Sequence, residues 1–161
     1  MSEEKTLNNL DPITIQKYQQ NRYPCFFVDK IEEVIIGKSA KGYKNFTYNE
    51  WFFPAHFEDE PNVPGFVQIE TLAQVFLMTF LTIPGNEGKK AAALSSQAKF
   101  KKKIIPGDRL DIFAELDSYK RGLAKGKVKG YIDGELANEV ELVVSIPEIM
   151  LNFMPNTNKE K

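Results

Sequence analysis

The sequence predicts an α+β fold in which a strongly curved antiparallel sheet wraps around one long apolar helix. The segment FVQIETLAQVFLMTFLTI, residues 66–83, is apolar on nearly every side, so as a helix it must be covered by its own domain. The second half of the chain alternates polar and apolar residues between turn signals such as Asp133-Gly134. With 161 residues, 42% of them hydrophobic and 12% aromatic, the chain suits one folded domain with a real core.

The N-terminal elements are predicted from capping and turn residues. A short helix is expected over about 11–20, because an aspartate followed by a proline suits the N-cap and the first helical turn. Two strands should follow, at 25–36 and 39–48. The prolines between Pro54 and Gly65 then indicate an ordered loop with little regular backbone pairing.

The remaining elements are one long helix and four strands. The helix is expected over about 65–83, where a Pro-Gly pair ends it. Antiparallel strands are then expected at 91–103, 108–119, 124–132 and 135–146. One helix wrapped by such a sheet is the hot-dog fold, whose open sheet edges favour pairing in a dimer. A single domain is therefore expected over 1–146, followed by a polar, mobile tail over 147–161.

Composition argues against several classes of protein. Basic and acidic residues nearly cancel to a net charge of −1, so nothing indicates a nucleic-acid partner. Cys25 is the only cysteine, so no internal disulfide or zinc cluster is expected, which fits a reducing cytoplasm. The first residues lack a basic start followed by an apolar run, so no signal peptide is expected. Glu70 and two glutamines interrupt the apolar helix, which argues against a membrane span.

The candidate chemistry lies between Trp51 and Gln74. His56 is the only histidine, and a single histidine among aromatics is more often a packed or surface residue than a catalyst. Glu70 has apolar neighbours, and a buried carboxyl tends to stay protonated, so it is a candidate proton donor that Gln74 would orient. At the junction of loop and helix, Gly65 lets a ligand oxygen approach unpaired backbone N–H groups.

Three longer runs carry a resemblance to a known family. They are NRYPCFFVDKI, KNFTYNEWFFPAHFEDEPNVPGFVQIETLAQ and AKFKKKIIPGDRL. In order, and in the spacing of histidine and glutamate, they resemble the β-hydroxyacyl-[acyl carrier protein] dehydratases of type II fatty acid synthesis, over about 12–146. The resemblance implies a hot-dog fold. It also implies dehydration of a (3R)-3-hydroxyacyl chain, linked through phosphopantetheine to acyl carrier protein, in fatty acid or specialised lipid biosynthesis.

The resemblance gives each candidate residue a role. His56 would remove the C2 proton, Glu70 would donate a proton to the leaving C3 hydroxyl, and the Gly65 amide would polarise the thioester carbonyl. Phe66 and Gln74 would line the substrate site. The paired histidine and glutamate come from different protomers in the family, so a homodimer with shared active sites, and a trimer of dimers, are implied. No metal or redox cofactor is implied, because elimination of water is redox-neutral acid–base chemistry.

A basic run is the candidate docking surface for the acidic carrier protein. Its members are Lys99, Lys101, Lys102 and Lys103, with Arg109 as a possible addition. An ordinary solvated strand end would explain the run equally well, and the resemblance favours docking.

Several positions depart from the family pattern. Asn21 stands where the family's first histidine is expected, Ala55 replaces the glycine before the catalytic histidine, and Gln68 replaces an aliphatic residue. The acidic segment 58–60 would favour the protonated form of His56 if it lay close.

These departures leave two alternatives open. One is a hot-dog thioesterase, which would use a carboxylate to activate water and would release a free acid. The other is a non-catalytic, dehydratase-like subunit of a heteromeric enzyme. The fold alone does not choose among them.

Overall fold

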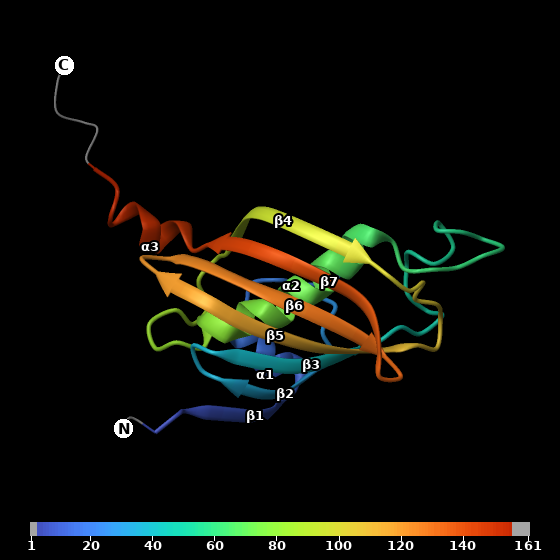
Figure 1. Ribbon diagram of the computed structural model, residues 1–161, viewed down its shortest axis with the longest axis horizontal. Coiled ribbons are helices and arrows are strands. Elements are labelled where there is room, and N and C mark those ends of the chain that lie inside the picture. The colour runs from blue at the N-terminus through green and yellow to red at the C-terminus, as the bar shows by residue number, and fades with distance from the viewer. Residues whose placement is uncertain (1–2, 156–161) are drawn as a thin grey trace, which may run out of the picture.

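The computed structural model describes residues 3–155 as one seven-stranded antiparallel sheet curved around a central helix (Figure 1). The strands are β1 (Thr6–Leu10), β2 (Lys30–Ile35), β3 (Ser39–Asn45), β4 (Ala92–Phe100), β5 (Arg109–Lys120), β6 (Leu123–Ile132) and β7 (Glu135–Ser145). The helices are α1 (Pro12–Tyr18), α2 (Gly65–Leu81) and α3 (Pro147–Leu151). The strand order β1-β2-β3-β5-β6-β7-β4 puts β4 at an edge, beside β7. The expected α+β hot-dog fold is confirmed.

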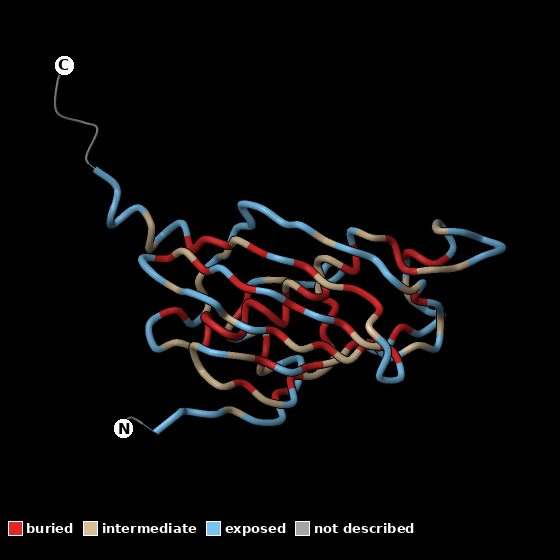
Figure 2. The backbone as a smooth tube through the Cα atoms, in the orientation of Figure 1, coloured by how far each residue is buried: buried red, intermediate tan, exposed pale blue. Residues whose placement is uncertain are grey.

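The central helix α2 is enclosed by the concave side of the sheet. Twelve of its 17 residues are buried, and it packs against β3, β5 and β6. Gly126 on β6 allows this close packing, because a Cβ atom there would collide with the Phe76 ring. Figure 2 shows the buried residues concentrated along the helix and the strands that face it. Within the described chain, no helix is long and apolar enough to cross a membrane.

The N-terminal region differs from the sequence prediction in two places. β1 was not expected, because TLNNL is short and lacks a clear polar–apolar alternation, yet it pairs with β2 and places Leu10 opposite Ile31. The strand expected from residue 25 begins only at Lys30. The reason is that the Phe27 N–H donates to the Gln74 side chain over 2.8 Å instead of to a neighbouring strand.

The predicted helix boundaries are close, and a short helix that was not predicted follows the sheet. α1 ends at Tyr18 and α2 at Leu81, each two residues before the expected end. A short helix, α3, occupies 147–151, where a mobile tail was expected, because Pro147 suits a first helical turn and Ile149 packs against the core. Residues 156–161 of that expected tail lie outside the described chain.

Two surfaces beside each other are left uncovered in the single chain. On β4 every residue except Ala98 is exposed, and only one of its edges is paired within the described sheet. On α2 the incompletely buried positions after the first residue form one helical face, which we call the uncovered stripe: Phe66, Ile69, Glu70 and Ala73. The start of α2 lies against the end of β4, since a Cβ on Gly65 would be 3.1 Å from the Phe100 ring.

Candidate active site

His56 lies in the loop that leads into α2, and one of its ring nitrogens forms a hydrogen bond with the backbone. Its Nδ1 is 3.0 Å from the backbone oxygen of Asn62. A carbonyl oxygen only accepts, so Nδ1 carries the hydrogen and Nε2 is left as the basic nitrogen. The backbone holds the loop around it, because the His56 N–H donates to Phe53 O and the Asn62 N–H donates to His56 O. The half-buried imidazole is therefore oriented as a proton acceptor.

His56 opens onto a pocket of about 340 Å³ at the start of α2. Its walls include Gly65, Gln68, Phe100 and the lysine run 101–103. Among the described hydrogen bonds none uses the Gly65 N–H, so this amide remains available to a ligand. Any side chain at position 65 would press on the Phe100 ring, which explains a glycine there.

A buried chain of amides fixes the turn before Gly65. The Asn138 Nδ2 donates to Gln68 Oε1 over 2.9 Å, and the Gln68 Nε2 donates to Val63 O over 3.0 Å. Gln68 is 5% exposed and Asn138 is fully buried, and Asn138 Oδ1 has no partner in the described chain. Gln68 therefore anchors the turn that presents the Gly65 N–H to the pocket.

Glu70 is less buried than the sequence predicts, because it belongs to the uncovered stripe of α2. Two amide groups hold its carboxylate: Asn21 Nδ2 and Gln74 Nε2 each donate to Oε1 over 3.1 Å. Gln74 orients Glu70 as expected. The contact from Asn21 was not predicted, because in the sequence this residue stands out only as a departure from the family motif.

Gln74 is itself fixed on every side. It is fully buried, its Nε2 also donates to Cys25 O over 2.8 Å, and its Oε1 accepts from the Phe27 N–H. The side chain of Gln19 donates to its backbone oxygen over 3.0 Å. This network ties the loop after α1 to α2 and leaves the Gln74 amide one orientation toward Glu70.

His56 and Glu70 do not share a pocket within one chain. The described residues that line the His56 pocket do not include Glu70, and the side-chain contacts of Glu70 lie on the side of the loop after α1. Phe66, on the uncovered stripe, is 64% exposed.

The acidic loop is partly neutralised by the basic run. Glu60 forms an ion pair with Lys103, and the hydrogen bond from Lys103 holds the pKa of the Glu60 carboxyl below its usual value. Glu58 and Asp59 are exposed, as is Ala55.

Most members of the basic run already form ion pairs with acidic side chains of the same chain. Lys99 lies 4.0 Å from Glu139, and Lys102 pairs with Glu135 over 2.8 Å. Arg109 lies in a separate cluster, where it pairs with Asp111 and Glu32 and stacks on the Tyr43 ring with its guanidinium 3.7 Å from the ring centre. Lys101 is exposed and lines the His56 pocket without an ion-pair partner in the described chain. It is therefore the cation most available to a ligand at that pocket.

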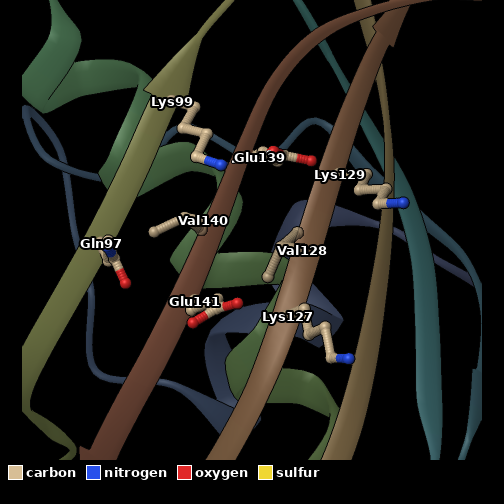
Figure 3. A pocket seen from close by; sticks show the side chains of 8 residues that line it. All are labelled: Gln97, Lys99, Lys127, Val128, Lys129, Glu139, Val140 and Glu141. Atoms are coloured by element: carbon tan, nitrogen blue, oxygen red, sulfur yellow. Dashed lines mark ion pairs between the residues drawn. The ribbon is translucent and has the colours of Figure 1, made fainter.

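A second pocket, of about 320 Å³, lies on the outer face of the sheet (Figure 3). Lysines of β6 stand opposite glutamates of β7 there, as in the facing pair Lys127 and Glu141. Such cross-strand pairs are an ordinary means of stabilising a solvated sheet face, and the only histidine lies elsewhere.

A sheet-wrapped helix that carries an acid near its start, preceded by a loop with an oriented imidazole, defines a hot-dog protein built for acid–base chemistry. The FabA-like domain model matches residues 20–141. The chain is 44% identical over 138 residues to the 3-hydroxyacyl-[acyl-carrier-protein] dehydratase FabZ of Clostridium botulinum; the aligned region covers 85% of this chain and 96% of that relative. The chain is 42% identical over 133 residues to the protein of the same name from Clostridium novyi; the aligned region covers 82% of this chain and 94% of that relative. The chain belongs to the FabA-like family, and within it to the FabZ-type dehydratases.

Solved structures of low sequence identity show the same fold. The dehydratase heterocomplex ApeI:P from Xenorhabdus doucetiae superposes with a TM-score of 0.72 at 14% identity, covering 90% of this chain and 97% of that one. An uncharacterized protein, PH1136 from Pyrococcus horikoshii, gives a TM-score of 0.64 at 15% identity, covering 81% and 91%.

Proposed function

We propose that this protein dehydrates (3R)-3-hydroxyacyl-[acyl carrier protein] to the trans-2-enoyl thioester, in fatty acid or specialised lipid biosynthesis. The observation that carries the proposal is the oriented imidazole of His56 beside the free amide of Gly65, in a chain whose Glu70 is held by two amide donors. The 44% identity to a FabZ dehydratase supports the same substrate class.

The site residues divide the elimination between a base and an acid. Nε2 of His56 takes the C2 proton, and the electrons of that C–H bond form the C2–C3 double bond. The C3–O bond breaks as Glu70 gives its proton to the leaving hydroxyl, so water departs. The Gly65 N–H donates to the thioester oxygen, where negative charge develops. A well-placed acid or base of this kind contributes about 10²–10⁴-fold to the rate.

The complete site belongs to a homodimer in this proposal. Glu70 lies on the uncovered stripe, the neighbouring strand β4 has a free edge, and His56 and Glu70 do not share a pocket in one chain. A partner that pairs with β4 would cover the stripe and bring its own His56 to Glu70. The proposal extends to a trimer of dimers.

Carrier docking and location complete the proposal. Lys99, Lys101, Lys102 and Lys103, with Arg109, would meet the acidic carrier protein, and Lys101 is the least neutralised of them. The single free thiol, Cys25, supports a reducing compartment, the cytoplasm.

Mixing two inactive variants tests the shared site. His56→Ala and Glu70→Gln should each abolish formation of the enoyl thioester. Unfolded together and refolded as a mixture, they should recover about a quarter of wild-type activity, because half of the random dimers are mixed and each has one complete site.

Three controls separate the outcomes of this experiment. Refolded wild type and each variant alone set the upper and lower limits of activity. If the refolded mixture regains no activity, the site lies within one chain. An active His56→Ala protein would refute the role of His56 as the base. Release of free thiol in place of the enoyl product would indicate a thioesterase.

A further inference from the structure

We propose that Asn21 is a positioning residue for Glu70, and that it helps fix which carboxyl oxygen carries the transferable proton. The inference rests on the proposed dehydratase function. Asn21 and Gln74 donate to the same oxygen, Oε1, each over 3.1 Å, and no hydrogen bond in the described chain reaches Oε2.

Two donors at one oxygen decide where the proton sits. An oxygen that accepts two N–H bonds acts as the carbonyl oxygen of the neutral carboxyl, so the hydrogen belongs to the other oxygen. The acid is therefore Oε2–H, on a half-buried side chain of the uncovered stripe. When Oε2 gives its proton to the leaving C3 hydroxyl, the two N–H groups at Oε1 stabilise the carboxylate that remains.

The backbone of Asn21 is anchored independently of Glu70. The guanidinium of Arg22 donates to the backbone oxygens of Gln16, Gln19 and Asn21, over 2.9, 2.8 and 2.8 Å. These hydrogen bonds satisfy backbone carbonyls at the end of α1 and fix the position of the first residues of the loop after α1. Asn21 is thus held at a fixed place beside α2, as a positioning residue requires.

The test replaces the donor with a carboxylate of the same shape. Asn21→Asp should lower kcat about 10- to 100-fold, with KM nearly unchanged. Asn21→His, which restores an N–H donor, should recover most of kcat. Asn8→Asp makes the same chemical change on exposed β1, and it should alter neither kcat nor KM.

The outcomes distinguish the inference from the proposed function. A wild-type kcat in Asn21→Asp would overturn the inference. So would a loss of kcat that Asn21→His does not reverse, since that would show a purely structural role. A wild-type protein without dehydratase activity would refute the proposed function, and the inference with it.

Discussion

At the scale of single residues, amide side chains hold the candidate catalytic groups in place. Asn21 and Gln74 fix the Glu70 carboxyl, and Gln68 fixes the turn that presents the Gly65 amide. Amides suit this task because they donate and accept together and stay neutral, so they position charged groups without changing the local charge.

Gln68 should prove costly to replace. In Gln68→Leu, the carbonyl of Val63 and the amide of Asn138 both lose their partner in a buried site, so the free energy of unfolding should fall by about 1–3 kcal/mol. Urea denaturation monitored by circular dichroism measures the change.

A double variant shows whether the loss of stability in Gln68→Leu comes from its hydrogen bond with Asn138. Gln68→Leu with Asn138→Val removes both ends of one hydrogen bond, so its loss should be smaller than the sum of the two single losses. Strictly additive losses would mean that the two amides act independently.

The candidate site residues could be named from the sequence, and the side chains that hold them in place could not. His56, Gly65 and Glu70 follow from their residue types and from the loop–helix junction between them. The bond from Asn21 to Glu70 spans 49 residues and exists because α1 ends where it does. No local pattern encodes such a contact. The expected burial of Glu70 was wrong for the single chain because a helix pattern does not show which face the sheet leaves open.

At the scale of elements, an aspartate caps the start of the short helix α1. The side chain of Asp11 accepts from the Thr14 N–H over 2.8 Å, and this hydrogen bond holds the pKa of the Asp11 carboxyl below its usual value. A lowered pKa means that the cap stabilises the fold above the usual carboxyl range, and that this contribution is lost as the pH falls through the folded-state value.

Asp11→Ala should therefore lower the urea midpoint at about pH 7, and the difference from wild type should shrink at about pH 2. Parallel urea titrations at the two pH values measure it. Asp59→Ala, in an exposed loop, is the control that should leave the midpoint unchanged. A difference that persists unaltered at low pH would show that the cap acts through something other than its charge.

Elements with a clear pattern of apolar residues in the sequence were predictable. Elements whose form depends on contacts with distant parts of the chain were not. α2 follows from its apolar run, and β5 to β7 follow from alternation and turns. β1 forms because the edge of β2 accepts it, and the segment before β2 stays irregular because Gln74 satisfies its backbone.

At the scale of the whole molecule, the proposed homodimer would form through the edge of β4 that is unpaired within the described sheet. Leu94, on that strand, is 58% exposed, and a lysine at an open edge opposes pairing with another strand. Leu94→Lys should therefore shift the protein toward monomer in sedimentation velocity at matched concentration, and should reduce activity in parallel.

Leu151→Lys is the matched control for this change. Leu151 is 66% exposed on α3, which is not part of the sheet, so its replacement should leave both the assembly and the activity unchanged. An unaltered sedimentation coefficient in Leu94→Lys would show that subunits meet through another surface.

The place of α3 has a practical consequence for handling the protein. α3 and the loop that carries His56 lie at opposite ends of the molecule (Figure 1). An affinity tag or a sensor chip attached through the α3 end would therefore hold the protein by the end remote from the imidazole. Immobilised in this way, the molecule would present its pocket to an incoming carrier protein, which is the orientation that binding measurements and flow reactors require.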